Sequence, residues 1–162
     1  MSKRPPSATV EARLTPSMSG EGYFVVFRLE RQLYALPLEN VRRAVRMAAL
    51  TSLPDAPPWS AGLLNLGGEA LPVLDLRARF GLATRPPHPD DRLLVVETGI
   101  GRFLLWVDAV LEVTAPARHE IQPPPTALTA SRPLLGSFRR GHSLVLALDA
   151  ARLLPVSQQE EG

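Results

Sequence analysis

Apolar residues in this chain come in short runs, and this feature restricts the fold more than any other. The runs are four to seven residues long and cover residues 23–29, 33–37, 41–47, 71–76, 93–96, 103–107, 110–113 and 144–148. Strands have these lengths, whereas a buried helix needs a longer apolar pattern. The sequence therefore predicts an all-β domain of many short strands, either a barrel or a sandwich.

Glycine and proline separate the runs. Gly67-Gly68 lies between two apolar stretches, and Gly99-Ile100-Gly101 lies between two others, which is typical of tight β-hairpins. The chain also has 17 prolines, and their clusters at 57–58, 86–87 and 123–125 exclude long helices. No strand alternates with a long helix, so a doubly wound nucleotide-binding fold is not expected.

Two short helices are predicted from capping residues. Asp75 is placed to cap residues 76–80 before Gly81 ends the helix. Asp149 is placed to cap residues 150–154 before Pro155 ends that segment. We interpret both aspartates as helix caps rather than as catalytic groups.

Length and composition indicate one globular domain or two very small ones, with a tail at each end. The chain has 162 residues, 45% of them apolar, and folding at this size hides roughly 70% of the accessible surface. Segments 1–22 and 155–162 lack apolar periodicity and are expected to be disordered tails around a domain at 23–154. Neither an export signal nor a bilayer-spanning run is found, so we expect a cytoplasmic protein without membrane insertion.

The sequence offers little support for catalysis, metal binding or cofactor binding. Cysteine is absent, and His88, His119 and His142 lack the spacing of metal ligands, so surface loops explain them best. The adjacent acids Asp90-Asp91 and Glu160-Glu161 are typical of solvated loops. Motifs for a serine nucleophile or a phosphate loop are missing as well. We therefore expect no catalytic, cofactor-binding or metal-binding residues, and no enzyme activity.

Nucleic-acid binding by a small barrel is a weaker alternative. Arginines cluster at Arg42, Arg43 and Arg46 and again at 139–140, but the net charge is only +2. Barrels that hold single strands use exposed aromatic side chains as stacking platforms. Here Tyr23, Phe24, Phe27, Phe103 and Trp106 lie inside apolar runs, and Trp59 is the one aromatic residue placed for exposure. Solvated strand edges explain the arginines better.

Five segments, in order, resemble one known family. They are YFVVFRLERQLYALPLENV, TSLPDAPPWSAGLLNLGGEALPVLDLRARFG, RFLLWVDAVLEV, IQPPP and LVLALDAARLL, between residues 23 and 154. Together they are similar to the CheW-like domain, and the resemblance extends over 132 of the 162 residues. It implies two intertwined small five-stranded barrels with short helices.

The resemblance also implies a role as an adaptor rather than a catalyst. CheW-like proteins bind the cytoplasmic tip of chemoreceptors and the regulatory domain of the histidine kinase CheA, so both are expected partners. A module of the same fold in a non-chemotaxis signalling or motility complex is the alternative.

Six partner-binding positions follow from matching the family's motifs. Val41 matches the receptor-facing valine, Ala44 follows it in the same run, Gly62 matches a tight-loop glycine and Asn65 begins the NLRG signature. This signature reads NLGG here, so Gly67 replaces an arginine, and Arg43 replaces a common glutamate. Both members of a usual polar pair are missing, and one has the opposite charge. We therefore expect a divergent member with an unusual partner.

Overall fold

The computed structural model describes residues 22–155. The predicted tails, 1–22 and 155–162, lie almost entirely outside the described residues. Between residues 22 and 155, none of the helices has both the length and the apolar character needed to cross a membrane.

Short strands are the main regular element of the described chain, which confirms the all-β prediction. They are β1 (Phe24–Leu29), β2 (Gln32–Pro37), β3 (Val41–Arg46), β4 (Ser60–Leu66), β5 (Glu69–Asp75), β6 (Arg92–Thr98), β7 (Gly101–Val107), β8 (Ala109–Thr114), β9 (Leu134–Arg140) and β10 (Ser143–Leu148). The helices are single turns: α2 (Leu76–Arg79), α3 (Thr126–Thr129), and the 3-10 turns η1 (Leu38–Asn40), η2 (Arg118–Glu120) and η3 (Ala150–Arg152).

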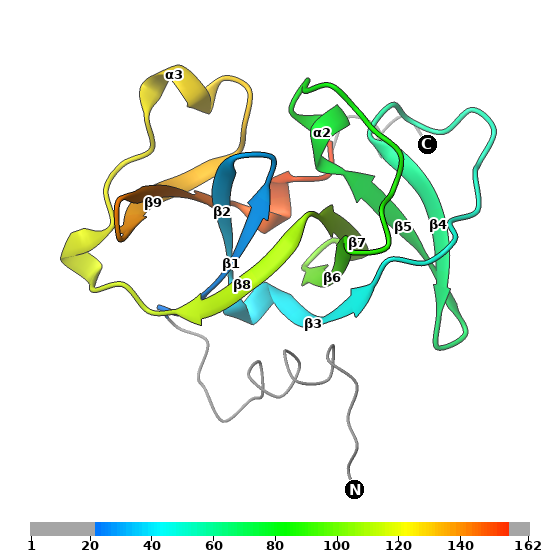
Figure 1. The fold of residues 1–162 in the computed structure, drawn as a ribbon, viewed down its shortest axis with the longest axis horizontal. Helices are drawn as coiled ribbons and strands as arrows, with labels where there is room; N and C mark the ends of the chain where they lie inside the picture. Colours follow the sequence, from blue (N-terminus) through cyan, green and yellow to red (C-terminus); the bar gives the residue numbers. More distant parts are fainter. Residues whose placement is uncertain (1–21, 156–162) are drawn as a thin grey trace, which may run out of the picture.

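The strands form two five-stranded sheets that are intertwined (Figure 1). Sheet A has the order β8-β1-β2-β10-β9, and sheet B has the order β3-β6-β7-β5-β4. The chain begins in sheet A, crosses to build all of sheet B, and returns to complete sheet A. The isolated bridges Thr51–Leu63 and Gln122–Ser137 each link the segment after one edge strand to the opposite edge strand. Each sheet therefore curls into a small barrel, as the family resemblance implied.

Apolar runs are continuous, rather than alternating with polar residues, because the strands are buried on both faces. On β1, Val25 and Phe27 belong to a shared core that contains residues of both sheets. Phe24 and Val26, on the opposite face of the same strand, belong to a cluster confined to sheet A. Strand β6 divides its side chains in the same way between the shared core and a cluster confined to sheet B. Full burial of each such side chain contributes about 1.5–3 kcal/mol.

The predicted turns and caps are confirmed. Gly67-Gly68 joins β4 to β5, and the Gly99 to Gly101 turn joins β6 to β7. The Asp75 side chain accepts hydrogen bonds from the N–H groups of Arg77 and Ala78 at the start of α2. The Asp149 side chain accepts one from Ala151, although the segment it caps is the shorter 3-10 turn η3.

Strands β4 and β9 were not among the predicted apolar runs. In β9 the run is interrupted by Gly136 and ends in two arginines. A Cβ at Gly136 would lie 2.8 Å from the carbonyl oxygen of Gln122, on the segment that bridges to β9. The glycine that obscures the strand in the sequence is therefore required by the close approach that closes sheet A.

Candidate functional site

Three predicted partner-binding residues lie on β3, an edge strand of sheet B. Val41 and Ala44 are buried in the shared core, with exposed fractions of 4% and 2%. A bulge between Val41 and Arg43 shifts the pairing of β3 with β6. Because of this shift, Val41 and Ala44 both face inward although they are three residues apart. Arg43 is half-buried, and Arg42 and Arg46 are exposed. In this structure the arginines, rather than Val41 and Ala44, present the surface of β3.

The other three predicted residues lie on β4 and the turn that follows it. Gly62 has φ +123°, and a Cβ there would lie 2.5 Å from the carbonyl oxygen of Thr51. Its role in the structure is to let the Thr51–Leu63 bridge close the barrel. Asn65 is exposed, and its Oδ1 accepts a hydrogen bond from Gly68 N–H at 3.1 Å. Gly67 is exposed in the same turn, with φ +61°, and a Cβ there would meet nothing within 4 Å.

A row of alternating charges crosses sheet B beside this turn. Arg42 on β3 pairs with Glu97 on β6, and Arg102 on β7 pairs with Glu97 at 3.4 Å and with Glu69 on β5 at 3.0 Å. Hydrogen bonds and charges from Arg42 and Arg102 hold the pKa of Glu97 below its usual range, against a smaller opposing effect of burial. The row neutralises Arg42, whereas Arg43 and Arg46 form no ion pair with any described residue.

The sequence contains one signal for this row of charges that was not used in predicting the site. Glu97 and Arg102 lie symmetrically about the Gly99-Ile100 turn, and they are cross-strand partners in the structure. A hairpin at this turn therefore already places these two opposite charges face to face.

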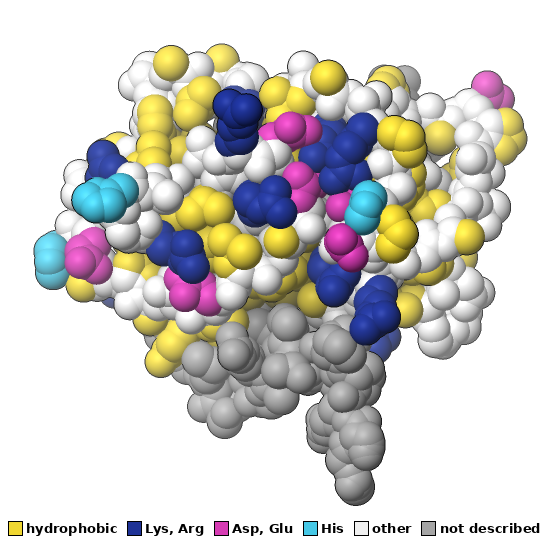
Figure 2. Space-filling view, in the orientation of Figure 1, with side chains coloured by type: hydrophobic (Ala, Val, Ile, Leu, Met, Phe, Trp, Pro, Cys, Tyr) yellow, Lys and Arg dark blue, Asp and Glu magenta, His cyan; other side chains and the backbone are white. Residues whose placement is uncertain are grey.

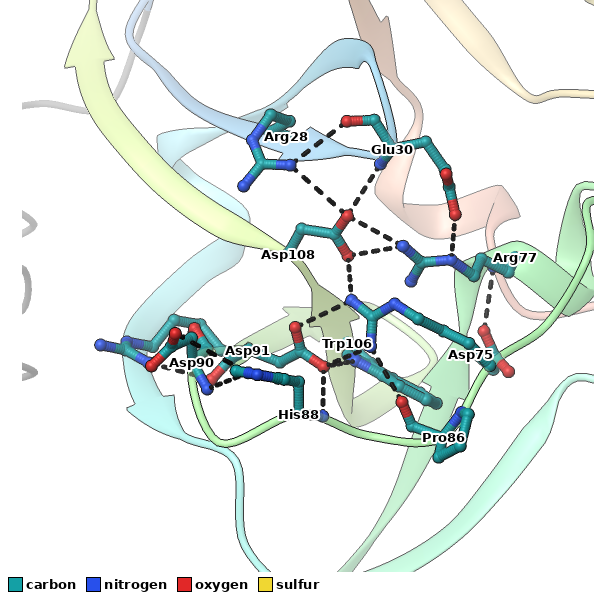
Figure 3. Close-up of polar contacts among 12 residues, drawn as sticks. Arg28, Glu30, Asp75, Arg77, Pro86, His88, Asp90, Asp91, Trp106 and Asp108 are labelled. Carbon is teal, nitrogen blue, oxygen red and sulfur yellow. Dashed lines mark hydrogen bonds and ion pairs between the residues drawn. The ribbon is translucent and has the colours of Figure 1, made fainter.

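Where the two sheets meet, a cluster of ionised side chains joins them, and we call it the junction network: Glu30, Arg77, Arg85, Asp91 and Asp108. Figure 3 shows Glu30, Arg77, Asp91 and Asp108 of this cluster. Arg77 on α2 is 1% exposed and donates from Nε to Glu30 at 2.6 Å and from Nη2 to both oxygens of Asp108 at 2.8 and 2.9 Å. Glu30 lies in the β1–β2 turn of sheet A. Arg77 thus ties sheet B to the first hairpin of sheet A.

Arg85 extends the junction network along the 82–91 segment. Its guanidinium donates to both oxygens of Asp91 at 2.9 Å and to Asp108 Oδ1 at 3.0 Å. The hydrogen bond to Asp91 raises the pKa of Arg85 above its ordinary value. Basic and acidic side chains accordingly lie side by side on this face of the molecule (Figure 2).

The prediction that Asp90 and Asp91 are both solvated is wrong for Asp91. Asp90 is exposed, but Asp91 is 3% exposed and accepts hydrogen bonds from Arg85, from His88 N–H and from Trp106 Nε1. Burial raises the pKa of Asp91, and these donors together outweigh that effect, so the net pKa lies below the usual range. Trp106 and Arg85 reach Asp91 through the fold, so the residues next to it in the sequence did not reveal its burial.

The remaining predicted residues take structural positions. The three histidines are exposed, as expected of loop residues. Phe24, Phe27, Phe103 and Trp106 are buried, so their rings are not available as stacking platforms for bases. Trp59 is half-buried and packs against the shared core rather than standing free. Among the described residues, no group of three or more potential ligands could hold a metal ion.

Comparisons with known proteins agree with this geometry. The CheW-like domain model matches residues 23–158. The chain is 26% identical to a chemotaxis protein CheW of Treponema pallidum over 90% of each chain. It is 31% identical to protein FrzA of Myxococcus xanthus, over 86% of this chain and 89% of that protein.

A solved structure shares the fold. The crystal structure of the scaffolding protein TtCheW from Thermoanaerobacter tengcongensis superposes with a TM-score of 0.76 at 31% identity, covering 83% of this chain and 92% of that one. The intertwined sheets, their shared core and the match over nearly the whole described chain lead to one conclusion. The chain belongs to the CheW-like domain family.

Proposed function

We propose that the protein is a non-catalytic adaptor that couples the cytoplasmic tip of a chemoreceptor to the regulatory domain of a CheA-like histidine kinase. The observation that carries this proposal is the match to CheW proteins and to a CheW scaffold over the whole two-barrel body. Its working place is then the cytoplasm, at the membrane-associated receptor arrays.

The two-barrel body is suited to an adaptor because it is stiff. The shared core spans both sheets, and the junction network adds charge-assisted hydrogen bonds between them. A partner bound at one end therefore fixes the orientation of the surface at the other end. Individual contacts of this kind need only be modest, because linked sites in an array strengthen one another.

The proposed receptor-facing surface of this chain is basic. Arg43 and Arg46 lie on the edge strand β3 without acidic partners among residues 22–155, and Arg43 stands where a glutamate is usual. Like charges facing each other across an interface cost several kcal/mol, whereas opposite charges speed and orient docking. We infer that the cognate receptor or kinase presents an acidic surface to β3.

A second candidate function is an interaction module in a non-chemotaxis signalling or motility complex. The changes at Arg43 and Gly67 favour it, because they remove the usual charge pair that standard partners meet. Identification of partners by affinity capture from the native cell distinguishes the two: a receptor and a CheA-like kinase support the array role, and their joint absence supports the alternative.

Substitutions at positions 43 and 67 test whether the charges at these two positions select the partner. We expect Arg43→Glu combined with Gly67→Arg to shift binding from the cognate receptor tip toward a standard one, measured by pull-down with both tips. Gly67 has a left-handed φ, so the variant is also compared with Gly67→Asn, which tolerates that conformation. Arg139→Glu on β9 of sheet A serves as the control for a charge change on the other barrel. Unchanged preference in the double variant would show that these positions do not select the partner.

A further inference from the structure

A cavity of about 620 Å³ lies at the end of sheet B that carries α2. It is bounded by the segment after β3, the start of β4, α2 and the 82–91 segment, and small side chains line much of it: Ala48, Ala49, Ala61 and Ala78. Trp106 and Asp75 also line it. A cavity of this size falls within the range of ligand pockets, about 300–1,000 Å³.

Asp75 has one carboxylate oxygen to spare in this cavity. The residue is 8% exposed, and its Oδ1 accepts hydrogen bonds from Arg77 N–H at 3.0 Å and from Ala78 N–H at 3.5 Å. Its Oδ2 accepts none from any described residue, and Figure 3 shows that oxygen on the side away from the Arg77 backbone. Burial raises the pKa of Asp75, and the hydrogen bonds and nearby arginines offset only part of this effect. Oδ2 is not fully buried, so it is accessible to water or to a donor group of a ligand that enters the cavity.

The other charged group in the wall is already satisfied. Arg85 is held by Asp91 and Asp108, and its guanidinium lies 5.9 Å from the centroid of the Trp106 ring. Its positive charge disfavours an ammonium group in the same cavity, so a neutral donor suits Asp75 Oδ2 best. The alanine methyl groups favour an apolar body for the rest of the ligand.

We propose that this cavity is an anchor pocket for a tyrosine side chain of a partner protein, with the phenol O–H donating to Asp75 Oδ2 and the ring packed against the alanines. The choice of a protein side chain rests on the proposed adaptor function. Tyrosine delivers apolar area and one donor with few rotatable bonds, which makes it an effective interface anchor.

The equivalent position in the other sheet is a natural contrast. Asp149 follows β10 as Asp75 ends β5, and each caps the turn after it. The Asp149 side chain is 27% exposed and has Arg152 4.0 Å away. An acidic cap alone therefore does not make the pocket, and its burial beside a lined cavity does.

The pocket itself is tested without any partner. We expect p-cresol, the tyrosine side-chain analogue, to shift the Trp106 indole N–H resonance of the full chain and to bind at least tenfold more tightly than toluene, which has the same ring and no donor. Equal affinities, or no shift with p-cresol, would overturn the pocket.

Variants locate the site and its acceptor. Asp75→Asn keeps a good helix cap but replaces the spare acceptor with a donor, so it should remove the preference for p-cresol over toluene. Ala78→Leu should fill the cavity and abolish binding of both p-cresol and toluene. Ala151→Leu, at an exposed position on η3, should change the binding of neither compound. A preference that survives Asp75→Asn would contradict the assignment of Asp75 Oδ2.

The source of the tyrosine is tested separately. Ala78→Leu should weaken capture of the cognate receptor or kinase at least tenfold, whereas Ala151→Leu should not. If Ala78→Leu blocks p-cresol and leaves capture unchanged, the tyrosine does not come from these partners, and the proposed anchor role is wrong although the adaptor function stands. If the unaltered chain captures neither partner while p-cresol still binds, the adaptor function fails and the pocket remains.

Discussion

The first and second halves of the described chain build the same structure twice. Strands β1–β5 and β6–β10 each begin with a hairpin in one sheet and then place three strands in the other. In sheet A the hairpin strand β2 runs parallel to β10, and in sheet B its counterpart β7 runs parallel to β5. The closing bridges also correspond, from Thr51 to β4 and from Gln122 to β9.

The side chains on this repeated backbone differ, and sheet B carries those that the proposed function uses. Sheet B carries the basic edge strand β3, the charge row and the cavity beside α2. Arg77, which follows the helix cap Asp75 of this sheet, is buried. In sheet A the cap is Asp149, and the arginine that follows it, Arg152, is exposed. The backbone thus specifies the two barrels, whereas side chains give sheet B a distinct surface.

We expect the greatest contrast in stability between the two halves when Arg77 and Arg152 are replaced. Arg77→Met should lower the free energy of unfolding by about 3–5 kcal/mol, because it leaves Asp108 and Glu30 without their buried partner. Arg152→Met should change it by less than about 0.5 kcal/mol, as is usual at exposed positions. Urea denaturation of both variants measures this, and equal losses would show that the junction network does not hold the sheets together.

Gly62 and Gly136, which lie at the bridges that close the two barrels, should differ less in their effect on stability. Gly62→Ala is expected to cost about 2–4 kcal/mol, because the new Cβ meets Thr51 and the φ is left-handed. Gly136→Ala meets Gln122 without that φ and should cost about 1–3 kcal/mol. Gly67→Ala has the left-handed φ in open space, so thermal unfolding of this variant isolates the backbone contribution. A cost for Gly62→Ala no greater than for Gly67→Ala would contradict the close contact.

Asp91 and Asp149 allow a comparison between a fully buried carboxylate and a more accessible one. Asp91→Asn should lower stability at pH 7 by about 1–3 kcal/mol, and Asp149→Asn should have little effect. The pKa of Asp91 is lowered by folding, so its contribution is present above the ordinary aspartate pKa of about 3.9 and is lost as the pH falls through the lower folded value. Acid titration of the two variants should show their difference shrinking below that pH.

Asp75 is expected to give the smallest effect, with the opposite sign. Folding raises its pKa, so its favourable contribution is complete below about pH 3.9 and is lost as the pH rises through the folded value. Asp75→Asn should therefore stabilise the protein at pH 7 by less than about 1 kcal/mol and match the unaltered chain in acid, as urea denaturation at both pH values would measure. Destabilisation at neutral pH would show that Oδ2 already has a partner.

The sequence predicted strands and turns better than it predicted contacts between them. Two-sided burial leaves continuous apolar runs, and glycine pairs mark hairpins, so most strands could be located. Strand β9 was missed because Gly136 breaks its run, and Asp91 was misplaced because its donors Arg85 and Trp106 come from elsewhere in the fold. The cavity beside Asp75 had no local signal, since empty space depends on how distant segments pack.

The exchange of strands between the sheets bears on how this molecule forms and evolves. Neither barrel can be completed early in synthesis, because sheet B needs β6 and β7 from the second half and β10 must insert between β2 and β9. Such distant pairings slow folding to the range of about milliseconds to seconds. For the same reason neither barrel can be excised, inherited or traded as a module, so the two ends of the adaptor must persist or be lost together.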